Sequence, residues 1–520
     1  MSDEPAADLA AELVEGLRAA TELLEAVVAD RSLLEHLSLE ERTRLLSAAG
    51  DVFEPDIYER RRQIKAQRRQ QKQERARADQ ATLDDTGIRS LRARPVFTTP
   101  NLPAPPALGE GDEWGDGDDR ESLLPMHCYV CKRKYTEIHP FYDQLCRECG
   151  DFNHAKRSET TDLSGRVALL TGGRVKIGYQ AGIKLLRAGA HLIVTTRFPR
   201  DSAVRYAAEP DFAEWGHRLE IFGLDLRHTP SVEAFCHHLL DTRDRLDFIV
   251  NNACQTVRRP PAFYRHMMDA ELGPLADLPT PAAGLLGAYE GLRAVDMLTA
   301  GHDVASSGDD PAAGVLPVGV VRAAALSQAP LLPEDAVASG DLFPEGRLDQ
   351  DLQQVDLRER NSWRLTLAEV SSVELLETQL VNAVAPFVLN ARLKPLMLRS
   401  PGRDQHIVNV SAVEGQFYRR FKTTRHPHTN MAKAALNMMT RTSAADYHAD
   451  GIHMNSVDTG WVSDEDPVHI AERKTSQHHF HPPLDIVDGA ARIVDPIITG
   501  VATGEHVWGQ FLKDYRPTDW

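Results

Sequence analysis

The chain contains 520 residues, a length typical of two or three domains. Hydrophobic residues make up 42% of it, which is enough to build a globular core, and the formal net charge of −17 argues against wholesale binding to nucleic acid or to an acidic membrane surface. No apolar run approaches the roughly 20 residues of a membrane span, and the acidic start MSDEPAADLA lacks the features of a secretory signal. We therefore expect a cytoplasmic protein, and four of its six cysteines have metal-ligand spacing, which fits a reducing compartment.

Residues 1–90 are predicted to form a helical region. Apolar residues recur there at helical spacing, at Leu9, Leu13, Leu17, Leu24 and Val28. Ser38 followed by Glu41 forms a capping box that opens a further helix through Leu46. We interpret the apolar stripe as packing rather than as a site for a partner.

A basic run lies within this region, at residues 59–77, with nine basic and two acidic residues. Such runs can bind phosphate backbones, but no aromatic residues interleave here for base stacking. A solvated helix is therefore favoured over a nucleic-acid site. Residues 91–122, rich in proline, glycine and acidic residues, are predicted to form a flexible linker.

Residues 123–157 contain two cysteine pairs, Cys128-x-x-Cys131 and Cys146-x-x-Cys149, separated by fourteen residues. Two tight pairs supply four thiolates to one tetrahedral ion, so the spacing predicts a zinc ribbon. Four cysteine ligands leave no position for water, which indicates a structural zinc. We expect this module to dock against the following domain or a protein partner and to take no part in substrate chemistry.

The stretch from Leu163 to Thr196 reads as strand, glycine-rich turn, helix and second strand. Glycines at 172, 173 and 178 allow backbone amides to approach phosphate, and the following helix directs its positive end at the anion. This context predicts a dinucleotide site. Arg174 and Lys176 lie in the turn and Thr196-Arg197 follows the second strand, where NAD-binding proteins usually carry an acid, so NADP is favoured over NAD.

Later strands end in polar residues: Asp225, then the pair Asn251-Asn252, and then Ser411. A helix over residues 430–447 carries Lys433, and one more strand spans 452–457. Strands alternating with helices predict an α/β, doubly wound parallel sheet of Rossmann type, preceded by the zinc ribbon and the helical region.

The region from about Leu163 to Trp520 resembles the short-chain dehydrogenase/reductase family. The matching positions are Thr171, Gly172, Gly178, Asp225, Asn251, Asn252, Ala253, Asn382, Ser411 and Lys433. The resemblance implies an NADP-binding domain over residues 160–520 and a homo-oligomer. It implies cofactor contacts at Thr171, Gly172, Gly173, Arg174, Lys176, Ile177, Gly178, Thr196, Arg197, Asp225, Leu226, Asn252, Ala253 and Lys433. It also implies that Ser411 and Lys433 are catalytic and that Asn382 supports the lysine through a water.

Three positions depart from the family pattern. Lys176 replaces the second turn glycine, as in the subset that includes pteridine reductases, where a cation accompanies NADP. Cys254 replaces the glycine after Asn-Asn-Ala, and we interpret it as buried and inert rather than reactive. Thr429 stands four residues before Lys433, where the family has its catalytic tyrosine.

Threonine is a much weaker acid than a phenol, so the proton donor is open. The candidates are His428, Tyr418 and Thr429 acting through a water. If none serves, the domain binds its cofactor without hydride chemistry.

Residues 257–361 form an insertion far longer than a crossover needs, with a mobile middle that includes Ser306–Gly314. Such an insertion is more often a lid or partner surface than padding. Arg258, Arg259 and Trp363, near its ends, either hold an anionic or planar substrate or are ordinary loop residues.

The leading hypothesis is an NADP(H)-dependent oxidoreductase that acts on a carbonyl, imine or ring double bond of a small-molecule substrate. The alternative is an NADP-binding regulatory or scaffold protein with little turnover, whose zinc module and insertion bind a protein partner. A third hypothesis is a nucleic-acid-associated adaptor that uses the ribbon and the basic run.

Overall fold

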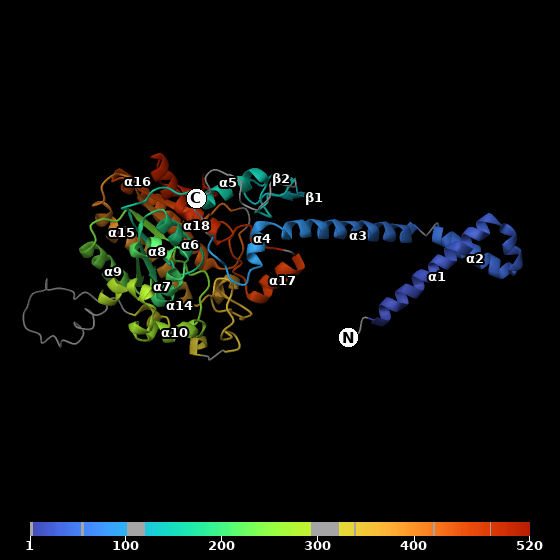
Figure 1. Ribbon diagram of the computed structural model, residues 1–520, viewed down its shortest axis with the longest axis horizontal. Helices are drawn as coiled ribbons and strands as arrows, with labels where there is room; N and C mark the ends of the chain where they lie inside the picture. Colours follow the sequence, from blue (N-terminus) through green and yellow to red (C-terminus); the bar gives the residue numbers. More distant parts are fainter. Residues whose placement is uncertain are drawn as a thin grey trace, which may run out of the picture. The chain divides into compact units, whose positions relative to one another are not determined.

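An eight-stranded sheet forms the centre of residues 79–520 in the computed structural model (Figure 1). Its strands are β3 (Val167–Thr171), β4 (His191–Thr196), β5 (Leu219–Gly223), β6 (Phe248–Asn251), β7 (Gln405–Ser411), β8 (Ile452–Asp458), β9 (Phe511–Lys513) and β10 (Arg516–Thr518). They lie in the order β10-β9-β8-β7-β6-β3-β4-β5, and every neighbouring pair except β9–β10 is parallel. All residues of β7 and β8 are buried, as helices on both faces of a parallel sheet require. The predicted doubly wound α/β fold is confirmed.

The helices on the two faces come from crossovers in opposite directions. The chain moves one way from β3 through α6 (Lys176–Arg187) to β4, and the other way from β6 through α15 (Ala385–Met397) to β7. Because such crossovers are right-handed, α6 and α15 cover opposite faces. Helix α18 (Ile486–Thr503) packs against α6, whereas α9 (Thr229–Thr242) packs against α15 and α16 (Pro427–Ala449) lies along β8.

Shorter elements complete this unit. They are α4 (Gly87–Arg92), α5 (Arg147–Ser158), α7 (Pro199–Ala207), α8 (Phe212–Trp215), η2 (Gly216–Arg218), η6 (Ser362–Arg364), η7 (Leu367–Glu369), α14 (Ser372–Gln379), the π-turn η8 (Leu380–Val384), η9 (Val413–Gly415) and α17 (Val468–His478). The insertion contributes η3 (Pro261–Tyr264), α10 (Arg265–Leu272), η4 (Leu275–Asp277), α11 (Thr280–Gly284), α13 (Ala323–Leu326) and η5 (Pro333–Ala336).

The zinc module is a two-stranded antiparallel ribbon, β1 (Glu121–His127) with β2 (Lys134–Glu137), followed by α5. It docks on the sheet domain through buried polar pairs. Tyr142 donates a 2.5 Å hydrogen bond to Asp488, and Arg157 pairs with Asp485 at 2.6 Å. Since both aspartates lie at the start of α18, the module is anchored to a helix that packs against the sheet domain's core.

The structure describes residues 4–53, 57–100, 120–292, 322–336, 340–419, 422–478 and 480–520. Most of the predicted linker and the Ser306–Gly314 part of the insertion lie outside these residues. None of the described helices is long and apolar enough to cross a membrane.

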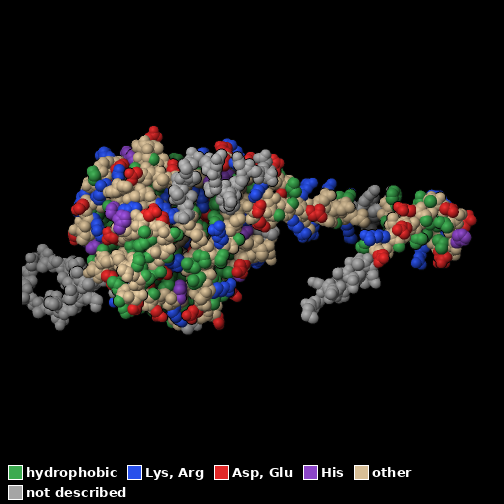
Figure 2. Space-filling view, in the orientation of Figure 1, with side chains coloured by type: hydrophobic (Ala, Val, Ile, Leu, Met, Phe, Trp, Pro, Cys, Tyr) green, Lys and Arg blue, Asp and Glu red, His purple; other side chains and the backbone are tan. Residues whose placement is uncertain are grey.

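Residues 1–78 form a separate unit by their contacts. It contains α1 (Glu4–Ala29), η1 (Arg31–His36), α2 (Leu39–Phe53) and most of α3 (Ile57–Asp84). The predicted capping box is present, because the backbone amide of Ser38 donates to the Glu41 carboxylate and the backbone amide of Glu41 donates to Oγ of Ser38. The interpretation of the apolar stripe as packing is wrong for its described residues, since Leu17 and Val28 are 67% and 81% exposed and hydrophobic side chains lie on this unit's surface (Figure 2). The 26 residues of α1 are opposed mainly by η1 and the 15 residues of α2, which offer too little surface to bury such a stripe.

Candidate active site

A cavity of about 1290 Å³ lies along the carboxyl ends of the parallel strands. Its walls include residues that follow β3, β4, β5, β6, β7 and β8. Doubly wound sheets bind nucleotides at this edge, where loops and helix N-termini converge. The glycine turn and the predicted catalytic residues Ser411 and Lys433 line the same cavity.

The turn after β3 is packed so closely that glycine is required at two positions. Gly172 has a φ of 70°, and a Cβ on it would lie 2.8 Å from the Cα of Ala253. A Cβ on Gly178 would lie 2.2 Å from the carbonyl oxygen of Gly172. Asn252 ties the end of β6 to this turn by donating hydrogen bonds of 3.1 Å to the carbonyls of Thr171 and Gly172. The result is a narrow backbone cradle in front of the N-terminus of α6, the arrangement that binds phosphate.

Two predicted cofactor contacts at this turn, Lys176 and Gly173, differ in whether they line the cavity. Lys176, the residue in place of a turn glycine, adopts a left-handed φ of 55°, which is costly for a residue with a side chain. Its ammonium lines the cavity, and although burial disfavours the charge, Glu465 and Asp351 outweigh it and raise the pKa of Lys176. Gly173, predicted to contact the cofactor, is packed against the sheet on the side where a side chain would start, since a Cβ there would meet Val194 at 2.8 Å.

The two predicted arginines, Arg174 in the turn after β3 and Arg197 past the end of β4, have different partners. Arg174 pairs with Asp201 at 2.7 Å, so its charge is compensated. Arg197 donates a 2.6 Å hydrogen bond to the hydroxyl of Tyr264 and lies 4.7 Å from the centre of that ring. It makes no ion pair with a carboxylate in the described part of the chain. Arg197 therefore offers a free positive charge at this end of the cavity.

Asp225, predicted to contact the adenine, is held by Arg227 in an ion pair of 2.6 Å. Burial favours its neutral form, but the hydrogen bonds from Arg227 outweigh burial and lower the pKa of Asp225. Both side chains line the cavity beside Leu226. The carboxylate is thus ionised and fixed in one orientation.

At the other end of the cavity, α16 presents three side chains, at Thr429, Asn430 and Lys433, and His426 caps the start of the helix beside them. The spacing of Thr429, Asn430 and Lys433 follows the helical repeat, whereas the left-handed backbone of His426 places that ring independently of it. Lys433 donates a 2.8 Å hydrogen bond from Nζ to the carbonyl of Val410 at the end of β7. Ser411 follows directly, and its Oγ lies 3.5 Å from the carbonyl of Lys433. The structure therefore brings Ser411, Thr429 and Lys433 together.

Thr429 is only 3% exposed, yet its Oγ1 has no hydrogen-bond partner among the described residues. Buried hydroxyls are nearly always bonded. Because Thr429 also lines the cavity, this orphaned oxygen fits a site completed by a bound molecule.

His426 was missed by the sequence reasoning. It has a left-handed φ of 42°, and its ring stacks on that of Trp363 with centroids 3.8 Å apart and planes 5° from parallel. Its Nδ1 lies 3.2 Å from Oδ1 of Asn430, and burial lowers the pKa of His426. The available signal was its position three residues before Thr429, directly before the proline that begins α16.

The other predicted donors are not in the cavity wall. His428 is 1% exposed and points to Glu374, whose Oε1 lies 3.6 Å from Nε2. Tyr418 is 93% exposed and does not line the cavity. Asn382 lies in the π-turn η8, where its Oδ1 accepts a 2.7 Å hydrogen bond from the amide of Gln255 and so fixes the loop after β6.

Comparison with known proteins agrees with this arrangement. Residues 166–270 match the family model described as short chain dehydrogenase, and residues 360–483 match the model described as Enoyl-(Acyl carrier protein) reductase. These two segments match the short-chain dehydrogenase/reductase family, as the resemblance of the sequence predicts. The two matched segments flank the insertion, and together they contain the glycine turn, Ser411 and Lys433.

The similar proteins differ in how much of the chain they match. Uncharacterized protein R665 of Acanthamoeba polyphaga mimivirus is 29% identical over 390 residues, which are 73% of this chain and 72% of that protein. A fatty acyl-CoA reductase of Acinetobacter baylyi is 29% identical over 99 residues, 19% of this chain and 32% of that enzyme. Among solved structures, the Pseudomonas aeruginosa RhlG/NADP active-site complex is 16% identical, with a TM-score of 0.41 over 68% of this chain and 95% of that one.

The interpretation of Cys254 as buried is wrong, and the two ends of the insertion have different surroundings. Cys254 is exposed and lines the cavity, because the chain leaves the sheet after β6 and the following loop forms part of the wall. The insertion lies at the Arg197 end of the cavity, since Tyr264 and Phe263 pack with Phe198 beyond β4. Trp363 lines the opposite end, but Arg258 is paired internally with Asp335 at 2.6 Å.

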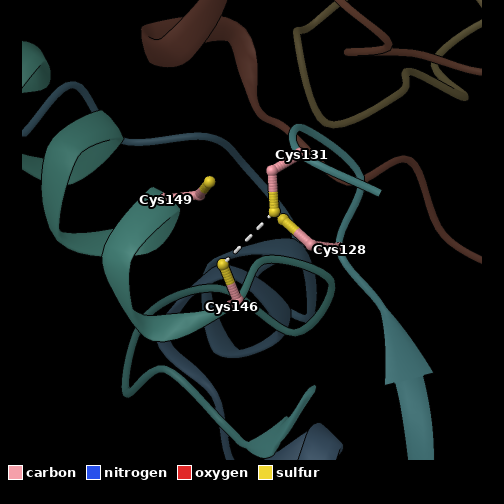
Figure 3. A group of neighbouring side chains, drawn as sticks. All are labelled: Cys128, Cys131, Cys146 and Cys149. Carbon is pink, nitrogen blue, oxygen red and sulfur yellow. Dashed lines mark hydrogen bonds between the residues drawn. The ribbon is translucent and has the colours of Figure 1, made fainter. Parts of the chain in front are cut away.

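The four cysteines converge as predicted (Figure 3). Their sulfur atoms all lie within 4.8 Å of one another, and those of Cys131 and Cys146 are 3.7 Å apart. Zinc–sulfur bonds of about 2.3 Å in a tetrahedron place sulfurs about 3.8 Å apart, so the donor set fits zinc. Unexpectedly, Tyr129 and Lys132 from the turn around the first cysteine pair line the cavity, so the module reaches the site.

Proposed function

We propose that the chain is an NADP(H)-dependent oxidoreductase that interconverts a carbonyl, imine or ring double bond with its reduced form. The observation that carries this proposal is the single cavity that joins the glycine cradle to Ser411, Thr429 and Lys433. A cofactor in the cradle would extend along the strand ends toward these residues.

The residues present fit a dinucleotide. The cradle of Gly172 and Gly178 would hold the pyrophosphate at the N-terminus of α6, and Asp225 the adenine. Arg197 would hold a 2′-phosphate, because its charge has no carboxylate partner among the described residues and its plane is fixed by Tyr264. These features favour NADP over NAD. When bound, the cofactor supplies or accepts the hydride.

Ser411 and Lys433 would orient the reacting groups. The Oγ of Ser411 is free to donate a hydrogen bond to a substrate oxygen, since its contact with the Lys433 carbonyl is long at 3.5 Å. Lys433, fixed by Val410, would hold the ribose hydroxyls and add positive charge where the substrate oxygen becomes negative. Thr429 Oγ1 would bind a water or the substrate directly.

We assign the proton to His426. Asn430 Oδ1 accepts from its Nδ1, so Nε2 is the atom left to exchange a proton at the cavity. With a carbonyl substrate reduced by the bound cofactor, the His426 imidazolium would give its proton to the substrate oxygen, directly or through a water at Thr429. The charged groups that act on this ring are Glu414, which favours the imidazolium, and His428, which disfavours it.

We also propose that zinc occupies the four-cysteine cluster in a structural role. Four thiolates leave no open coordination position. The ion would fix the turn that carries Tyr129 and Lys132.

A regulatory protein that binds NADP with little turnover is the second candidate, favoured by Thr429 in place of tyrosine. The test is to measure NADPH binding and NADPH oxidation with a panel of aldehydes, ketones and imines. Oxidation that is lost in Lys433→Met supports the enzyme. Tight binding without oxidation by any member of the panel supports the regulatory protein.

A further inference from the structure

The turn of the zinc module places a lysine and a tyrosine on the cavity wall. Lys132 and Tyr129 belong to the turn around Cys128 and Cys131, which we call the zinc knuckle (residues 128–132). The Tyr129 hydroxyl accepts a 2.9 Å hydrogen bond from the amide of Trp461, in the loop after β8. The knuckle is therefore fixed against the reaction end of the cavity.

Two ammonium groups gather on the Tyr129 ring. Nζ of Lys132 lies 4.7 Å from the ring centre and Nζ of Lys513 lies 5.3 Å from it. Lys513 is neutralised by Asp514, whereas Lys132 donates to the backbone carbonyl of Tyr129 and makes no ion pair with a carboxylate among the described residues. Lys132 also has a left-handed φ of 62°, so the turn holds this residue in a conformation that costs free energy.

The cavity is positive in a negative protein. Its described walls carry thirteen lysine and arginine residues against eight aspartate and glutamate residues, although the whole chain has a net charge of −17. Many of the cations are paired, as Arg419 is with Glu414 and Lys474 with Asp466. Lys132 makes no ion pair with a carboxylate among the described residues, although the charges of Cys128, Cys131 and Asp514 act on its ammonium group. A carboxylate on a ligand could therefore pair with it directly, and a concave wall concentrates its field.

The position of Lys132 separates it from the phosphate on the adenosine. Arg197, which would hold that phosphate, lies beyond β4. In the sheet, three strands, β3, β6 and β7, separate β4 from β8 and β9. Lys132 lies with Lys513 at the end of β9, beside the ring of Tyr129, whose hydroxyl accepts from the amide of Trp461.

We propose that the zinc knuckle selects a substrate that carries a carboxylate, which binds Lys132 while its reacting group lies at Ser411. That the bound substrate reacts at Ser411 rests on the proposed function, whereas the binding of a carboxylate at Lys132 does not. The carboxylate would approach the Lys132 ammonium from the cavity, away from the negative face of the Tyr129 ring, and aromatic side chains including Trp461 and Trp363 would contact the substrate's body.

The test uses benzoate and benzamide, which have the same shape and differ in charge. Each is titrated calorimetrically into the full-length protein, without cofactor and again with saturating NADP⁺. We expect benzoate to bind about tenfold more tightly than benzamide, with the preference shrinking as salt is raised. Lys132→Met should weaken the affinity for benzoate about fivefold and leave the affinity for benzamide unchanged. Lys134→Met removes the same charge from β2 outside the cavity and should change neither.

Equal affinity for benzoate and benzamide, absence of benzoate binding, or an unchanged preference in Lys132→Met would overturn the inference. So would a loss of NADP⁺ affinity in Lys132→Met, because it would assign the charge to the cofactor. Failure of the proposed function looks different: benzoate would still be preferred, but NADPH would not be oxidised by any substrate of the panel.

Discussion

The two ends of the cavity differ in how closely they keep the family pattern. At the cofactor end, Gly172, Gly178 and Asn252 lock together through contacts that leave no room for other residues. At the reaction end, Thr429 replaces the tyrosine, a histidine stacks on Trp363, and a turn of the zinc module joins the wall. We therefore infer that cofactor binding and proton transfer place separate requirements on the site. Backbone geometry dictates the first, whereas several side-chain arrangements can meet the second.

The largest effect is expected from Lys433→Met, which removes the lysine proposed to hold both the cofactor ribose and the developing oxyanion. Turnover should fall by at least about 10³-fold because the ribose and the developing oxyanion lose the same cation. The measurement is kcat/KM for NADPH oxidation with the best substrate of the panel. Lys394→Met is the control, since that lysine pairs with Asp446 on the surface of α15. Equal losses of kcat/KM in both variants would show that Lys433 has no specific role in the reaction.

His426→Asn tests whether the reaction end has its own proton donor. We expect kcat/KM for reduction to fall about 10²-fold, within the range of general acid catalysis. Reduction needs the protonated ring, and burial holds the pKa of His426 below its usual value. The wild-type rate of reduction should therefore fall as pH rises through that lowered pKa, and the rate of oxidation should rise. The pH dependence of the reduction rate should disappear in His426→Asn and remain in His428→Asn. A pH dependence that remains in His426→Asn and disappears in His428→Asn would refute the proposal.

Gly178→Ala tests the cofactor end alone. The added methyl would lie 2.2 Å from the carbonyl of Gly172 and 2.3 Å from Nδ2 of Asn252, so the cradle must open. We expect the Kd for NADPH to rise more than about tenfold through lost phosphate contacts. Gly284→Ala is the matched control, because nothing in the described structure lies within 4 Å of the new methyl. Unchanged NADPH binding in Gly178→Ala would show that the cofactor does not use this turn.

Arg197→Ala sharpens the choice of cofactor. The Kd for NADP⁺ should rise about tenfold while that for NAD⁺ stays within about twofold, because only the 2′-phosphate contact is lost. Arg174→Ala should discriminate less, since Asp201 already neutralises that charge. An equal rise for both cofactors would contradict the assignment to the 2′-phosphate.

Zinc removal should act at the reaction end and spare the cofactor end. After treatment with a chelator, benzoate binding should weaken about as much as in Lys132→Met, because the knuckle loses its fixed conformation. NADPH affinity should change by less than about twofold. A parallel loss of both affinities would mean that the module supports the whole domain rather than one wall.

The sequence predicted the cofactor end well because its signals are local. Glycines between a strand and a helix have one favoured interpretation, and the structure confirms the sheet that surrounds them. The placement of His426 was harder, because it depends on where α16 begins and on a partner, Trp363, sixty-three residues away in the chain. The contribution of Lys132 was not predictable from spacing, since it depends on how the module docks through Tyr142 and Arg157. Cys254 was misjudged because burial beyond a strand end depends on the loop's path.

The most direct test of the account is transfer of deuterium from NADPH labelled at C4 of the nicotinamide. The protein is incubated with labelled cofactor and the substrate panel, and the products are analysed by mass spectrometry. The account predicts one deuterium on the reduced carbon of at least one product, absent in Lys433→Met and strongly reduced in His426→Asn. Tight NADPH binding with no deuterium in any product would contradict it and leave a protein that holds the cofactor without using it.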